Sequence, residues 1–84
     1  MSFIDRLERN IAKRERAIEK ENEKLEDLKN KLKSNELTRA KYNIKKSKIE
    51  NKIRNLNARV RTLRGLITKE KKHIEEKNKK KNEK

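Results

Sequence analysis

The sequence contains no cysteine, proline or tryptophan, and only one residue each of glycine, tyrosine and phenylalanine. The absence of cysteine excludes disulfides and thiolate metal sites. So few turn-forming and aromatic residues argue against a small all-β domain, which needs them for its turns and its core. No apolar run approaches the about 20 residues of a membrane span, and the first residues lack the apolar region of a signal peptide. We therefore expect an all-α protein of the cytoplasm. Association with the nucleoid, with a ribonucleoprotein or with a virus is compatible with this expectation.

What the sequence has instead is charge. Half of its 84 residues are charged, and 28 Lys and Arg against 14 Asp and Glu give a net charge of +14. A chain of this length forms at most one small domain. Lys, Asn and Ile, which AT-rich codons encode, number 19, 10 and 8. This composition indicates a low-GC genome, such as that of a firmicute-like bacterium, its phages or plasmids, or an archaeon.

Apolar residues recur with the seven-residue repeat of a coiled coil. With Ile4 taken as position a of the repeat, apolar side chains occupy most a and d positions, and charged or amide side chains occupy most others. This pattern predicts an apolar seam along which helices pack, with a solvated outside. The predicted seam consists of Ile4, Leu7, Ile11, Ile18, Leu25, Leu28, Leu32, Tyr42, Ile49, Ile53, Leu56, Val60, Leu63 and Ile67.

The seam fails in the middle of the chain, where Asn35, Arg39 and Lys46 occupy three of its positions. Ser34 precedes this stretch as a candidate N-cap and is followed by the first-turn acid Glu36, which predicts the start of a second helix. The sequence therefore predicts one helix over about 3–33, a turn over about 34–37 and a second helix over about 37–75. At the first helix, Ser2 and Asp5 have the spacing of a capping box.

Two architectures fit this pattern. In the first, the two helices form an antiparallel coiled-coil hairpin within a domain of residues 1–76, and residues 77–84 are a basic, disordered tail. In the second, one continuous helix forms a coiled-coil dimer with another copy. The unbroken repeat and the lack of Gly or Pro at the turn favour the second. We favour the hairpin because folding at the turn places Ile11 opposite Val60 and Leu7 opposite Leu63.

A lone two-helix hairpin of this composition buries little apolar surface relative to the entropy lost on ordering it. We therefore expect self-association into a homo-oligomer, or folding that is completed on a partner. The polar residues Arg14 and Glu21 at two d positions would weaken a simple two-helix seam and help to set its register.

Basic charge gathers in the second half of the chain. Residues 1–33 carry ten basic and eight acidic residues, whereas residues 38–64 carry ten basic residues and one acid, Glu50. Steps of three and four place many of these cations in one stripe along a helix. Such a stripe is typical of contact with nucleic-acid phosphates, with little reading of base sequence. The predicted nucleic-acid-binding residues are Lys41, Lys45, Lys48, Lys52, Arg54, Arg59, Arg61 and Arg64.

The same pattern of charge is compatible with a function other than nucleic-acid binding. The alternative is a protein-interaction module, such as a small phage- or plasmid-type modulator or scaffold that binds an acidic protein surface or partner helices. A solvated outer face without any ligand is the simplest explanation of the lysines. Membrane binding is disfavoured because the apolar seam is narrow and lacks Trp. No nucleophile–base pair or phosphate-binding glycine loop is present, so we expect no enzyme. Glu70 and His73 lack the further carboxylates of a di-metal site, so we expect neither metal nor cofactor.

Residues 53–63, Ile-Arg-Asn-Leu-Asn-Ala-Arg-Val-Arg-Thr-Leu, resemble the second-helix signature of a family of large-subunit ribosomal proteins, which are small basic helical hairpins that bind ribosomal RNA. Arg54, Ala58, Arg59 and Thr62 stand at the corresponding places. The pattern departs at the residues between Asn55 and Ala58, and residues 1–33 lack the aromatic segment of the family's first helix. The resemblance implies RNA binding by this helix.

Overall fold

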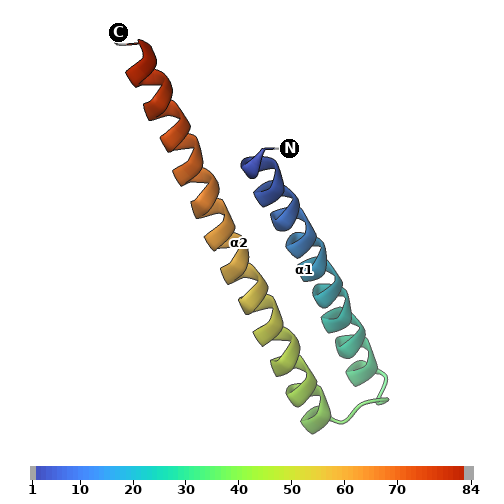
Figure 1. The fold of residues 1–84 in the computed structure, drawn as a ribbon. Helices are drawn as coiled ribbons and strands as arrows, with labels where there is room; N and C mark the ends of the chain where they lie inside the picture. The colour runs from blue at the N-terminus through green and yellow to red at the C-terminus, as the bar shows by residue number, and fades with distance from the viewer. Residues whose placement is uncertain (1, 83–84) are drawn as a thin grey trace.

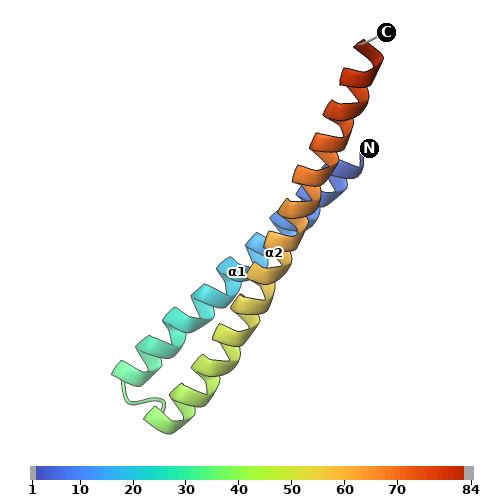
Figure 2. The same cartoon turned by 90° about the vertical axis from the view of Figure 1, so that its left-hand side faces the viewer.

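The chain folds into two long helices that pack side by side in opposite directions. In the computed structural model, which describes residues 2–82 and the side chains of residues 2–78, α1 spans Phe3–Lys33 and α2 spans Arg39–Asn82. Figure 1 and, at a right angle to it, Figure 2 show a short loop joining the helices at one end. The molecule measures 72 × 19 × 14 Å, and no strand occurs among residues 2–82. The predicted helical hairpin is confirmed, and the continuous helix is not the structure of this chain.

The first helix begins where the sequence predicts. The Ser2 hydroxyl accepts a hydrogen bond from the Asp5 backbone N–H at 3.1 Å, and the Ser2 N–H donates to the Asp5 carboxylate at 3.4 Å. This reciprocal pair is a capping box, which satisfies two backbone donors that the helix itself leaves free. The negative charge of Asp5 in the first turn also opposes the positive end of the helix dipole.

The turn forms without glycine or proline because Asn35 adopts a left-handed backbone conformation, with φ of 61°. Its N–H donates to the carbonyl of Leu32 at 3.2 Å, and the Glu36 N–H donates to the carbonyl of Lys31 at 2.9 Å. These two bonds form a Schellman motif, in which asparagine tolerates the conformation that glycine usually takes. Ser34 is therefore the C-cap of α1, and its prediction as an N-cap is wrong.

The second helix begins at Arg39, two residues later than predicted. The Thr38 hydroxyl accepts a hydrogen bond from the Lys41 N–H at 3.3 Å, and the Thr38 carbonyl accepts one from the Tyr42 N–H at 2.9 Å. Thr38 thus plays the part of the N-cap. Residues 34–36 were unavailable for that part because the Schellman motif at the end of α1 already uses them.

The core lies along the seam between the helices. Leu7, Ile11, Val60 and Leu63 form a buried cluster against which two further isoleucines of the seam pack. Nearer the turn, Leu28 and Tyr42 are buried as well. The other predicted seam residues are half-buried, namely Ile4, Ile18, Leu25, Leu32, Ile49, Ile53, Leu56 and Ile67. Two helices alone leave each of these side chains open on one side, so no large side chain of residues 2–78 is completely enclosed.

The second helix is longer than the first and extends past the beginning of α1 (Figure 1). Its overhanging part is exposed from residue 71 to residue 78, including Ile74 at 43%. α2 continues to Asn82, beyond the end expected near residue 75. Residues 83–84 of the expected tail lie outside the described residues, and its disorder stays a prediction. In the described part of the chain, neither helix has a stretch apolar enough to cross a membrane.

Candidate nucleic-acid interface

A shallow groove runs between the two helices near the turn, and lysines from both helices surround it. Its floor is formed by Leu28 and Ile49, which belong to the d positions of the repeat. The groove, called the lysine groove below, is lined by Lys24, Asp27, Leu28, Lys31, Lys45, Lys48 and Ile49. The groove therefore brings together four lysines from both helices and one acid, Asp27.

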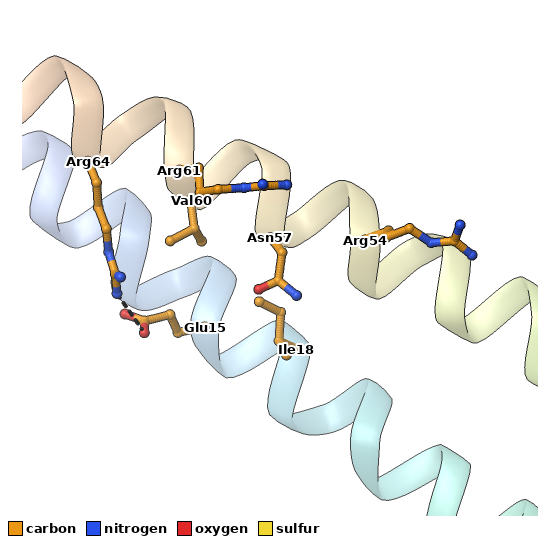
Figure 3. A pocket seen from close by; sticks show the side chains of 7 residues that line it. All are labelled: Glu15, Ile18, Arg54, Asn57, Val60, Arg61 and Arg64. Atoms are coloured by element: carbon orange, nitrogen blue, oxygen red, sulfur yellow. Dashed lines mark hydrogen bonds and ion pairs between the residues drawn. The ribbon is translucent and has the colours of Figure 1, made fainter.

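A second groove, called the arginine groove, lies along the other edge of the seam (Figure 3). Its floor is formed by Ile18 and Val60, which belong to the a positions of the repeat. Arg64 reaches from α2 to Glu15 of α1 and pairs with its carboxylate at 3.3 Å. The groove is lined by Glu15, Ile18, Arg54, Asn57, Val60, Arg61 and Arg64. Here one cation of α2, Arg64, is paired with an acid of α1.

The difference between the grooves follows from the repeat. In a heptad helix, positions g and c lie beside the d edge, and positions e and b lie beside the a edge. The c and g positions of the helices up to residue 64 carry ten basic residues and one acid, Asp27. We call this surface the basic face; its cations are Arg6, Lys13, Lys20, Lys24, Lys31, Lys41, Lys45, Lys48, Lys52 and Arg59.

The surface beside the a edge, called the mixed face, has the opposite character. Its b and e positions over the same helical residues carry five basic residues and six acids. The basic ones are Lys29, Lys33, Arg54, Arg61 and Arg64, and the acids are Asp5, Glu8, Glu15, Glu19, Glu26 and Glu50. Five of the six acids come from α1 and three of the five cations come from α2, and Arg64 pairs with Glu15 across the seam.

A buried carboxylate links the two helices beneath the basic face. Glu21 occupies a d position, is 5% exposed, and contacts Lys24 of its own helix at 3.1 Å and Lys52 of α2 at 3.3 Å. Burial by itself would raise the pKa of Glu21, but hydrogen bonds and charge attraction from both lysines outweigh it and hold the pKa below its ordinary value. The lysine side chains are 58% and 64% exposed, so their ammonium groups stay at the surface.

The structure divides the eight predicted binding residues between the two sides. Lys41, Lys45, Lys48 and Arg59 are exposed on the basic face. Lys52 belongs to the same face but is also held by Glu21. The other three lie at mixed-face positions, where they line the arginine groove: Arg54, which also donates to Asn51 at 2.8 Å, Arg61 and Arg64.

The contribution of α1 to the basic face is hidden when net charge is counted over each half of the sequence. Lys24 and Lys31 line the lysine groove together with Lys45 and Lys48, yet residues 1–33 have a net charge of only +2, from ten basic and eight acidic residues. The signal was present in the repeat, because residues 24, 31, 45 and 52 share the g position. The net charge of residues 1–33 does not reveal this pattern, because the acids of the first helix lie mostly at other positions of the repeat.

Neither groove gathers the side chains of a metal centre. Among the described residues, no three His, Asp or Glu side chains come together closely enough to hold a metal ion. Glu21 is the one buried charged residue in that part of the chain, and it is already paired with two lysines. The two grooves therefore present mainly cationic side chains to the solvent.

Comparison of the chain with protein-family models, curated proteins and solved structures gives no match. The resemblance of residues 53–63 to a ribosomal-protein family is thus limited to that short helical segment, and no family is assigned to the chain.

Proposed function

We propose that this protein binds nucleic acid through its phosphate backbone, with the basic face as the contact surface and no enzymatic activity. The observation that carries the proposal is the convergence of Lys24, Lys31, Lys45 and Lys48 on one groove that holds a single acid. Four ammonium groups so arranged repel one another, and a polyanion that enters their field relieves this repulsion.

Binding of this kind gains free energy mainly from counterion release. Each cation that neutralises a phosphate of duplex DNA changes log K by about 0.9 for each decade of salt concentration. Lysine acts as a flexible point charge, so it follows phosphates and does not fix the donor geometry that base reading requires. The proposal therefore includes low sequence specificity.

The test is fluorescence-anisotropy titration of labelled duplex DNA, duplex RNA and single strands at about 50, 150 and 300 mM salt. We expect micromolar or tighter binding at the intermediate salt concentration and a log–log slope of several units. Absence of binding at that concentration would contradict the proposal. Stoichiometric, salt-resistant binding to one acidic protein would instead support the alternative function, a protein-interaction module of the phage or plasmid type.

We also propose that the protein self-associates, because eight of its fourteen seam residues stay half-buried in a single hairpin and Leu66 and Ile74 are 39% and 43% exposed on α2. Sedimentation equilibrium without nucleic acid tests this directly. A molar mass of 10.2 kDa at every concentration would contradict self-association and leave the nucleic-acid proposal unaffected.

A further inference from the structure

We propose that the ligand of the basic face is a double-stranded nucleic acid, held by two parallel rows of cations of which α1 supplies one. This inference rests on the proposed function and deepens it. Both rows consist of basic-face cations: Lys41, Lys45, Lys48, Lys52 and Arg59 form the α2 row, and Lys13, Lys20, Lys24 and Lys31 form the α1 row.

The two rows cover the same length of the hairpin. Each extends over 18 residue steps, from Lys13 to Lys31 and from Lys41 to Arg59, which corresponds to about 27 Å at 1.5 Å per residue. The helices run antiparallel (Figure 1), so Lys31 in the last turn of α1 and Lys41 in the first turn of α2 both lie next to the turn. Ile11 and Val60 belong to one core cluster, which places Lys13 and Arg59 at a similar level near the other end of the rows. A length of 27 Å matches about eight base pairs at 3.4 Å each.

The separation of the rows is held by the fold. Lys24 and Lys52, one from each row, contact the same carboxylate oxygen of the buried Glu21 at 3.1 and 3.3 Å. Packed helices have axes about 8–10 Å apart, and the grooves of a B-form duplex are about 6–12 Å wide. Two rows at such a spacing can each follow one strand across a groove, whereas one flexible single strand would occupy only one of them.

The hairpin is too broad to enter a groove. Its backbone measures 19 × 14 Å across, and the major groove of B-form DNA, about 12 Å wide, admits one helix. The hairpin therefore rests on the phosphates that border a groove. Duplex DNA and duplex RNA both present two phosphate backbones that border a groove. The proposed ligand is therefore defined by this shared feature.

The basic face also lacks the platform on which single strands bind. Proteins that hold single strands stack successive bases on aromatic side chains. This chain has one Tyr and one Phe. Tyr42 is 8% exposed within the core, and Phe3, which is 51% exposed at a g position, is a single ring in the first turn of α1, away from the lysine groove. Without stacking, a single strand offers only its phosphates and binds more weakly than a duplex.

The experiment compares two pairs of lysine substitutions within α1. The variant Lys20→Gln/Lys31→Gln removes two cations of the α1 row, and the control Lys29→Gln/Lys33→Gln removes two from the mixed face. Each pair takes one cation from the last turn of α1, so the effects on the helix dipole are matched. Both keep Lys24, which holds Glu21. Circular dichroism of both variants verifies that the hairpin forms.

For a duplex of about 12 base pairs, the α1-row variant should lower the salt slope by about 1.8 and weaken binding about 30-fold at 150 mM salt, at 0.9 per contact. The control should change affinity less than about twofold. A single strand with the same number of phosphates should bind the wild-type protein at least about tenfold more weakly than the duplex.

Equal effects of the two variants, or equal affinity for single and double strands, would overturn the inference. If charge reversal at Lys45 and Lys48 nevertheless abolished binding, the proposed function would stand and only the two-row duplex contact would fail. If charge reversal at those residues had no effect either, the proposed function itself would fail. Parallel titrations with duplex DNA and duplex RNA show which source of the two backbones is preferred.

Discussion

The two sides of the hairpin share one seam and differ in nearly everything that surrounds it. On the basic face, ten cations stand with one acid, whereas on the mixed face five cations stand with six acids. Cross-helix contacts follow the same division: Arg64 and Glu15 neutralise each other over the arginine groove, and four lysines crowd the lysine groove. Net charge along a segment therefore says little about the field that a partner meets, because the helical repeat sorts charges by side.

The difference reaches into the seam itself. The a positions of α1 are all aliphatic, from Ile4 to Leu32, whereas its d positions include Arg14 and Glu21. Arg14 donates to Asn10 at 2.6 Å and is half-buried, and Glu21 is buried beneath two lysines. The edge of the seam next to the basic face is thus the polar one. This edge combines polar pairing in the middle of α1 with the buried apolar residues Leu7 and Leu28 nearer its ends.

The largest difference between the two sides is expected when charge is reversed on one side at a time. We expect Lys45→Glu/Lys48→Glu to weaken nucleic-acid binding more than about 100-fold at 150 mM salt, because two phosphate contacts worth about 30-fold are lost and repulsion is added. The matched control, Arg54→Glu/Arg61→Glu, makes the same change in net charge, from +14 to +10. It should weaken binding by less than about tenfold, through long-range charge alone. Anisotropy measures both, and equal losses would refute the assignment of the basic face.

The second largest effect concerns the carboxylate beneath the basic face. Lys24→Met/Lys52→Met removes both partners of Glu21 and leaves its buried carboxylate unpaired, which should lower the free energy of unfolding by about 1–3 kcal/mol. Glu21→Leu extends the apolar seam and should leave stability equal or higher, as hydrophobic replacements of buried ion pairs often do. Thermal unfolding monitored by circular dichroism distinguishes them. A more stable methionine variant would show that Glu21 is solvated in solution.

A smaller effect is expected from pH. The pKa of Glu21 lies below the ordinary value of 4.5 in the folded protein, so near pH 4 the unfolded chain binds more protons and stability falls as the pH falls. The stability that Glu21 contributes is therefore complete near neutral pH and is lost below pH 4.5. We expect the wild-type protein to melt at a higher temperature than Glu21→Gln near neutral pH, and this advantage to shrink below pH 4.5. If the wild-type melting temperature instead rose relative to that of Glu21→Gln on acidification, burial would dominate and the pKa of Glu21 would be raised.

The smallest effect is expected at a position that belongs to neither side. Gly65 lies inside α2 with a negative φ, and a methyl group there would meet no atom within 4 Å. Gly65→Ala should therefore raise the free energy of unfolding by about 0.5–1 kcal/mol, the usual difference in helix propensity. Nucleic-acid affinity should not change, because the residue is at an outer position away from the basic face. A marked loss of affinity would extend the contact surface beyond it.

Much of the fold could be predicted because it depends on local chemistry. The capping box of Ser2 and Asp5 and the end of α1 follow from short-range hydrogen bonding. The details of the turn could not, since Ser34 and Thr38 are both acceptable N-caps. The choice between them depends on the left-handed conformation of Asn35, which closes α1 before Thr38 opens α2.

The candidate site was predictable only in part. The cations of α2 are conspicuous because few acids lie between them in sequence. Those of α1, such as Lys24 and Lys31, are interspersed with acids and reveal themselves only when each residue is assigned to a side of the hairpin. The roles of Lys52 and Arg64 also needed the fold, since their partners Glu21 and Glu15 lie on the other helix.

The helical character of this protein, the course of its apolar seam and the strongly basic second half can be predicted from the order of its amino acids, because periodicity and composition are properties of each segment alone. The closing of the seam within one chain and the meeting of lysines from α1 and α2 around one groove follow from the fold. The interaction between two charges depends on their separation in space and not on their separation along the chain. Residues 24 and 52 are far apart along the chain, and antiparallel packing brings them to the same oxygen of Glu21.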